Sequence, residues 1–238
     1  MAERETGGVY HVFNRGVDHR ATFEDDRDRE RFTILLEHHR VPKAIAYSHL
    51  RRIRDRFVPD QERRTSPLVA IMGFCLMPNH FHLLLRQEAE NGIGKYAQRF
   101  LNSYTRYYNT RHRRKGPLFE GPFRAVRIET DAQLLHVSRY IHLNPVVANL
   151  AEDTFSYPWS SAAAYCTSSH RPPTWKVGSM VHIDTGLLES MIPPAEYESF
   201  VRDHVAYARV LAEIKHLVLE EEASTPRPVR QPSRLETA

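Results

Sequence analysis

The fold is indicated by one stretch of the sequence, Met77-Pro78-Asn79-His80-Phe81-His82-Leu83-Leu84-Leu85. Successive side chains of a β-strand point to opposite faces, so we expect His80 and His82 on one face and Phe81 on the other. The apolar residues on both sides of Pro78 predict two buried strands joined by a turn. A pair of imidazoles is therefore predicted on the surface of a sheet.

The histidine pair suggests a metal site that is only partly filled by protein. Imidazole is a common metal ligand, but two ligands leave a divalent cation open, so amide, carboxylate, water or substrate oxygens must complete its shell. Such an open site suits phosphate chemistry better than structural zinc. The same pattern also describes two ordinary surface histidines, because a motif without its structural context is only a hypothesis.

The flanking residues add a family resemblance. The run from Cys75 to Leu85 resembles the His-hydrophobic-His (HUH) signature of single-strand DNA nucleases and transposases, above all the REP-associated tyrosine transposases and their insertion-sequence relatives. Other stretches fit the same family in the same order and together span about two thirds of the chain: Tyr10 to Gly16, Leu118 to Phe123, Tyr140 to Val146 and Tyr157 to Ser161.

The resemblance implies a reaction and its residues. Tyr140 is the expected nucleophile, which cleaves single-stranded DNA, forms a 5′-phosphotyrosine and releases a 3′-hydroxyl. His80 and His82 would hold Mg²⁺ or Mn²⁺, with Asn144 as a third, oxygen ligand. A phenol has a pKa near 10 and needs such help to attack phosphorus. The substrate implied is a hairpin-forming, REP-like repeat.

Spacing supports part of this assignment. Residues four apart on a helix share a face, so Tyr140 and Asn144 could approach the histidines together. A buried tyrosine that bonds to the backbone is the alternative for Tyr140. The rival phenols are Tyr104, Tyr107 and Tyr108.

The order of elements predicts an α+β fold, in which an antiparallel sheet carries helices on its faces. The family resemblance sharpens this to a ferredoxin-like or RRM-like sheet with the histidines on a central strand. We expect strands at 10–15, 68–77, 80–85 and 123–128, and helices at 23–39, 93–109, 186–192 and 195–222. A further helix should begin at Thr130, with Gln133 as its capping partner, and stop at Pro145.

The domain organisation predicted is a catalytic domain at 8–165, a mainly helical extension at 166–222 and a disordered tail at 223–238. A basic segment at about 41–67 is predicted as an insertion relative to the family. The 238 residues suffice for one well-cored domain and an appendage.

Charge is concentrated rather than large. The formal net charge is +4, but residues 95–127 hold nine basic side chains against one acidic side chain. Basic residues interleaved with aromatic ones are typical of a nucleic-acid surface, although an ordinary solvated face is the alternative. The predicted DNA contacts are Asn14, Arg15, Lys95, Arg99, Asn102, Arg106, Arg113, Arg114, Lys115, Arg124 and Arg127. A role for Asn14 in stabilising a turn is equally possible, and His11 has no assigned role.

Two cysteines cannot form a disulfide framework, and the opening residues lack an apolar signal core. No apolar stretch reaches membrane-spanning length. We therefore expect a cytoplasmic protein with no membrane contact. The family resemblance implies either a monomer or a homodimer.

Two other functions remain open at this point. A catalytically silent or domesticated protein would bind the hairpin without forming an adduct. A metal-dependent hydrolase of small phosphoesters would turn over without DNA and would not need Tyr140.

Overall fold

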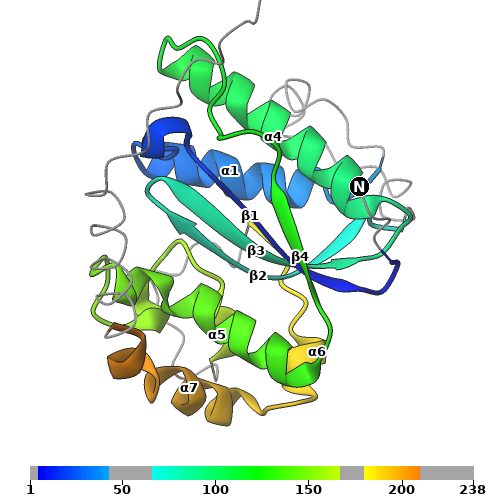
Figure 1. The fold of residues 1–238 in the computed structure, drawn as a ribbon, viewed down its shortest axis with the longest axis vertical. Helices are drawn as coiled ribbons and strands as arrows, with labels where there is room; N and C mark the ends of the chain where they lie inside the picture. The colour runs from blue at the N-terminus through cyan, green and yellow to red at the C-terminus, as the bar shows by residue number, and fades with distance from the viewer. Residues whose placement is uncertain (1–4, 43–65, 167–179, 210–238) are drawn as a thin grey trace, which may run out of the picture.

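A four-stranded antiparallel sheet lies between two layers of helices in the computed structural model, which describes residues 5–42, 66–166 and 180–209 (Figure 1). The strand order is β2-β3-β1-β4. The strands are β1 (Val9–Arg15), β2 (Val69–Met77), β3 (His80–Gln87) and β4 (Arg124–Ile128). The predicted turn at Pro78 and Asn79 joins β2 to β3, and the histidines lie on a central strand as expected.

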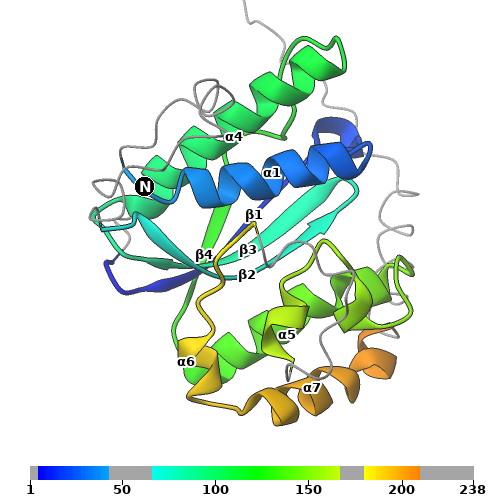
Figure 2. The ribbon, with the colours of Figure 1, turned by 180° about the vertical axis from the view of Figure 1, so that it is seen from behind.

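Helices cover both faces of the sheet. Figure 2 shows α1 and α4 on one side, with α5, α6 and α7 on the other. Their bounds are Asp26–His38, Gly92–Arg111, Asp131–Val147, Gly186–Glu189 and Pro194–Arg202, in that order. The succession β1-α1-β2-β3-α4-β4, with β1 and β3 central, is the ferredoxin-like arrangement. The predicted α+β class and sheet are therefore confirmed.

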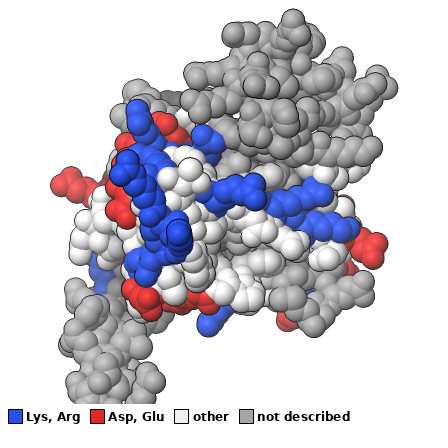
Figure 3. Space-filling view, turned by 90° about the horizontal axis from the view of Figure 1, so that it is seen from above, with Lys and Arg blue, Asp and Glu red and all other residues white. Residues whose placement is uncertain are grey.

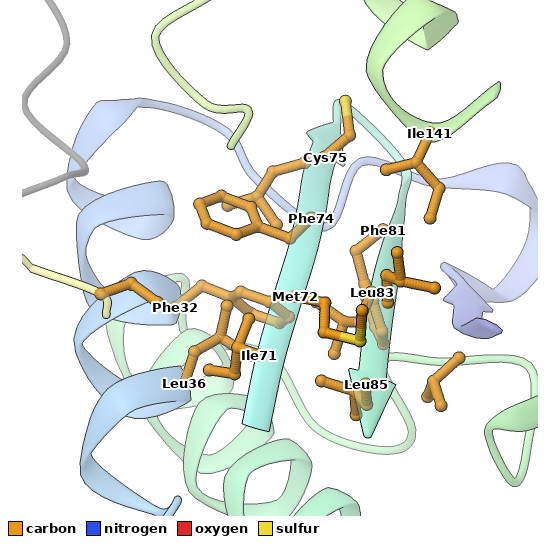
Figure 4. Packing of buried hydrophobic residues seen from close by; sticks show 14 of the residues in the cluster. Phe32, Leu36, Ile71, Met72, Phe74, Cys75, Phe81, Leu83, Leu85 and Ile141 are labelled. Atoms are coloured by element: carbon orange, nitrogen blue, oxygen red, sulfur yellow. The ribbon is translucent and has the colours of Figure 1, made fainter. Parts of the chain in front are cut away.

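The face under α1 and α4 is sealed by aromatic side chains. Phe81 from β3 meets Phe32 of α1 at a ring-centroid distance of 5.1 Å and Phe119 at 5.7 Å. Figure 4 shows Phe32 and Leu36 reaching in from α1, while Ile141 reaches the strands from α5. Phe32, Phe81 and Ile141 have no exposed surface. Burial of this kind supplies the main favourable term in folding.

The helix that carries Tyr140 begins as predicted. The hydroxyl of Thr130 accepts a hydrogen bond from the backbone N–H of Gln133 at 3.2 Å. The Gln133 side chain bonds back to the N–H of Glu129 rather than Thr130, at 2.8 Å. One backbone donor of the first turn and one just before the N-cap are thus satisfied, in an arrangement close to a capping box.

The predicted stop at Pro145 is wrong by two residues, because α5 continues to Val147 with Pro145 inside its last turn. Proline lacks an N–H and so removes one hydrogen bond, which is least costly near a helix end. Ala148 then caps the helix by donating to the carbonyl of Asn144.

The predicted C-terminal helices are shorter than expected within the described ranges. The helix expected at 186–192 ends at Glu189, and the one expected at 195–222 breaks after Arg202 and resumes over residues 205–209. His204 donates to the carbonyl of Val201, an i to i+3 bond of the kind that closes a helix.

Some predictions lie outside the described residues. They concern most of the 41–67 insertion, residues 210–222 and the 223–238 tail. The domain boundaries stay predictions. Over the described ranges, none of the helices combines the length and apolar character needed to cross a bilayer.

Candidate active site

His80 and His82 share one face of β3, as the alternation predicts. Their ring centroids are 5.0 Å apart and the rings are perpendicular. In the register of the sheet, His80 pairs with Arg15 and His82 with Phe13 of β1, while Phe81 points into the sealed face. Strand pairing therefore fixes the imidazoles beside a cationic and an aromatic side chain.

The two histidines line a hollow of about 310 Å³ on the α5 side of the sheet. Tyr140 projects into it from α5, and its ring lies 5.5 Å from the ring of His82, edge to face. Its side chain is half exposed, at 49%, so a large ligand can reach it. The hollow, called here the histidine-tyrosine pocket, is lined by Phe13, Asn14, Arg15, His80, His82, Glu120, Pro122, Arg124 and Tyr140.

The rival phenols lie elsewhere. Tyr104 and Tyr108 are buried, and their hydroxyls donate to the carbonyls of Thr22 and Ala21. Tyr107 donates to the carbonyl of Arg27 at 3.3 Å. All three belong to α4, on the opposite face of the sheet from Tyr140. The alternative role of a backbone-bonded tyrosine thus fits them and not the half-exposed Tyr140.

The Tyr140 phenol is not activated by the protein alone. Burial raises its pKa, while hydrogen bonding to Asn144 and the charge of Arg15 act in the opposite direction. The phenol thus stays protonated near neutral pH, and it needs a cation or a base to become a nucleophile.

Asn144 shares the helix face of Tyr140, but its amide nitrogen donates to the carbonyl of Tyr140 at 2.7 Å. Asn144 does not belong to the described lining of the histidine-tyrosine pocket. Its role as a metal ligand stays a prediction.

The imidazoles suit a divalent cation. Burial lowers the pKa of His80 to about 4, with help from the charge of Arg15, and it lowers that of His82 well below the ordinary value. Both rings are therefore neutral near pH 7 and can donate lone pairs to a metal. The Nε2 atom of His82 is buried with no hydrogen-bond partner among the described residues. An unsatisfied buried nitrogen facing a polar hollow is the feature that a metal ion would explain.

The protein offers only part of a coordination shell. Over the described ranges, no three side chains of the types His, Cys, Asp and Glu are grouped to hold a metal. Two imidazoles could hold Mg²⁺ or Mn²⁺ only if oxygen atoms from an amide, water or a phosphate complete the shell, as hard cations prefer.

The predicted DNA contacts fall into two groups. Arg15 and Arg124 are exposed and line the histidine-tyrosine pocket with Asn14. Asn14 is itself buried; its amide donates to the carbonyl of Gly121 and accepts from the N–H of Arg15. It therefore also fits the turn-stabilising role that the sequence left open.

The second group lies away from the pocket. Lys95, Arg99, Asn102 and Arg106 are exposed on α4, which covers the opposite face of the sheet. Figure 3 views the molecule from that side and shows rows of Lys and Arg side chains across it. Lys95, Arg99, Asn102 and Arg106 are called here the α4 stripe.

The loop and strand after α4 carry the remaining predicted contacts. Arg113 and Lys115 are exposed, whereas Arg114 donates to the side chain of Asn109. Arg127 pairs with Glu5 at 2.5 Å.

No role for His11 followed from the sequence, yet its Nε2 lies 2.9 Å from Nδ1 of His82. Alternation does place His11 on the same face of its strand as Phe13 and Arg15. The missing information was the register of β1 against β3, which pairs His11 with Leu84 and makes His82 its diagonal neighbour.

Comparison with known proteins bears on the same residues. The family model described as "Transposase IS200 like" matches residues 60–144, a range that contains His80, His82 and Tyr140. Among solved structures, a REP-associated tyrosine transposase bound to a REP hairpin aligns over 78% of this chain and 97% of its own, at 15% identity and a TM-score of 0.48. No curated protein matches the chain significantly.

Proposed function

We propose that this chain nicks single-stranded DNA and transfers the strand through Tyr140, because its residues 60–144 match the family model described as "Transposase IS200 like". The observation that carries the proposal is the position of the Tyr140 ring, 5.5 Å from His82 in a pocket that His80 also lines. A nucleophile from a helix and a metal-binding pair from a strand can thus act on one phosphate. A DNA substrate agrees with the cytoplasmic location expected from the sequence.

The proposed step is a transesterification. The phenolic oxygen of Tyr140 attacks phosphorus, the bond from phosphorus to the 3′-oxygen breaks, and a 5′-phosphotyrosine forms. The phenol gives up its proton, and the released 3′-oxygen takes one up. The number of phosphoester bonds is unchanged, so the reaction is reversible and strand transfer needs no nucleotide cofactor.

Each residue has a distinct task in this proposal. His80 and His82 would hold the cation, with Asn144 as a further oxygen ligand. Arg15 and Arg124, at the rim of the same pocket, would hold the phosphates on either side of the scissile bond. Bound Mg²⁺ or Mn²⁺ would polarise the scissile phosphate and offset the charge that builds during attack.

The proposed substrate is a hairpin-forming, REP-like repeat, presented with a single-stranded flank. The pocket supports the single-stranded part, because it is open to solvent beside a half-exposed tyrosine and two arginines. Single strands bind to basic grooves through their phosphates, with bases stacking on aromatic side chains. Phe13, in the pocket wall, is available for such contact.

The proposal is tested by incubating the protein with labelled hairpin DNA and Mn²⁺ and separating products on a denaturing gel. We expect a covalent protein-DNA species whose formation is prevented by EDTA. Tyr140→Phe should lose it completely and still bind the hairpin. Tyr207→Phe is the matched control, because Tyr207 is similarly exposed, at 56%, and lies outside the pocket.

Other outcomes identify the other functions. Hairpin binding without any adduct in the unmodified protein would indicate a silent DNA-binding protein. Turnover of a small phosphoester such as p-nitrophenyl phosphate, undiminished in Tyr140→Phe, would indicate a metal-dependent hydrolase.

A further inference from the structure

His11 contacts His82 but is not one of the proposed metal ligands. It lies on β1 opposite Leu84 of β3, so that His82 is its diagonal neighbour across the two strands. The rings of His11 and His82 are stacked, with centroids 5.1 Å apart and an interplanar angle of 25°. Nε2 of His11 lies 2.9 Å from Nδ1 of His82, which is hydrogen-bonding distance.

A hydrogen bond between two neutral imidazoles has a direction. One nitrogen must donate and the other must accept. The proton of the bond therefore belongs either to Nδ1 of His82 or to Nε2 of His11.

The far nitrogen of His82 distinguishes the two cases. If Nδ1 of His82 accepted, its ring proton would be on Nε2, as a buried N–H with no acceptor among the described residues. Buried N–H groups without an acceptor are rare and costly. If Nδ1 donates, Nε2 carries a lone pair instead, and a lone pair is what a metal ion needs.

His80 has the same arrangement with a different partner. Its Nδ1 lies 2.6 Å from the amide oxygen of Asn79, which can only accept, so the proton of His80 is on Nδ1 as well. If His11 is the acceptor for His82, two different acceptors select the same tautomer in both histidines. Both Nε2 atoms are left unprotonated beside the same pocket.

From this geometry we propose that His11 is a positioning residue. It accepts a hydrogen bond from Nδ1 of His82 and so keeps the Nε2 lone pair of His82 available for a divalent cation. The inference rests on the proposed function for its metal but concerns a residue outside the ligand set. Because its Nε2 is already used, His11 cannot bind the same cation through that atom.

The tautomer is measured directly by NMR. Long-range ¹H–¹⁵N correlation spectra of metal-free protein labelled at histidine nitrogens distinguish protonated from unprotonated ring nitrogens. The His82 signals are assigned with His82→Gln. We expect Nδ1 of His82 to be protonated and Nε2 to be unprotonated at pH 7.5. A proton on Nε2 would overturn the inference, and this result does not depend on whether any His11 variant folds.

The consequence for metal binding is tested with Mn²⁺ and a matched pair of variants, using calorimetry or electron paramagnetic resonance. His11→Phe keeps a stacked ring but offers no acceptor, and it should weaken Mn²⁺ binding about 10- to 100-fold, as is usual for partners of metal-ligating histidines. His11→Gln supplies an amide oxygen and should stay within about threefold of the unmodified protein. His136→Phe, an exposed histidine of α5, is the control and should bind normally.

The contrary outcomes are equally clear. Mn²⁺ affinity in His11→Phe equal to that of the unmodified protein would refute the positioning role. Equal losses in His11→Phe and His11→Gln would reduce the role of His11 to shape alone. Both measurements omit DNA, so they stand whether or not Tyr140 forms an adduct. An adduct that depends on Tyr140 while His11→Phe binds Mn²⁺ normally would leave the proposed function intact and refute only this inference.

Discussion

The two faces of the sheet differ although they are made by the same strands. Phe81 lies on one face, inside a cluster of aromatic rings under α1 and α4. The next residue, His82, lies on the other face beside His11, His80 and Tyr140. One strand therefore provides both a packed core and the wall of a polar pocket.

The difference shows how stability and reactivity are divided. The sealed face helps to hold the strands in register, and on the other face His82 contacts His11 and Tyr140. The pocket face can then keep a half-exposed tyrosine and a His82 Nε2 atom that has no partner in the described part of the chain, both of which would be unfavourable in a core. Charge does not follow this division. Arg15 and Arg124 line the pocket, but the α4 stripe is exposed on the other side of the sheet, where Arg111 is bound to Asp25 and Asp28.

The largest expected effect of a substitution on the pocket face is loss of metal. His82→Ala should lower Mn²⁺ affinity at least about 100-fold, because even indirect partners of metal ligands contribute 10- to 100-fold. The protein should remain folded by circular dichroism. Mn²⁺ calorimetry measures this, with His136→Ala as control. Undiminished Mn²⁺ binding would show that the histidine pair does not hold the metal.

On the sealed face the expected effect is on stability. Phe32→Ala should reduce the free energy of unfolding by about 3–5 kcal/mol, because Phe32 is fully buried and a cavity would remain. Val126→Thr, at a side chain that is 51% exposed on β4, should change it by less than about 0.5 kcal/mol. Urea unfolding compares the two. Similar losses at both positions would contradict the division between the faces.

The smallest expected effect is on the salt dependence of DNA binding, and it distinguishes the basic residues beside the pocket from those of the α4 stripe. If about five phosphates are neutralised, log affinity for single-stranded DNA should fall with log salt with a slope near −3.5. Arg124→Gln, beside the pocket, should reduce the steepness by about 0.7, the value of one contact. Lys95→Gln tests the α4 stripe in the same titration, by fluorescence anisotropy. A slope unchanged in both variants would mean that neither Arg124 nor Lys95 contacts the DNA.

Local features of the sequence were sufficient for much of the fold. Alternation around Phe81 placed both histidines on one face, and the Thr130 capping box located the start of α5. These inferences need only neighbouring residues. The end of α5 was harder to predict. A proline in the last turn of a helix costs little free energy, so it does not identify one residue as the end.

What the sequence could not supply was the relation between distant segments. The pairing of β1 with β3 brings His11 to His82, and no local pattern encodes that register. The concentration of basic residues at 95–127 predicted exposed contacts on α4, but it could not show that α4 covers the face opposite Tyr140. The site is therefore predictable as a set of residue types and only partly as a geometry.

The central claim is that Tyr140 is the residue that attacks DNA. It is tested most directly by forming the covalent complex with Mn²⁺ and a hairpin substrate, digesting it with nuclease and trypsin, and locating the nucleotide by tandem mass spectrometry. Trypsin cuts after Arg139, so Tyr140 begins its own peptide. We predict a nucleotide phosphate on Tyr140 alone. A nucleotide on Tyr107, Tyr108 or any other tyrosine would contradict the account.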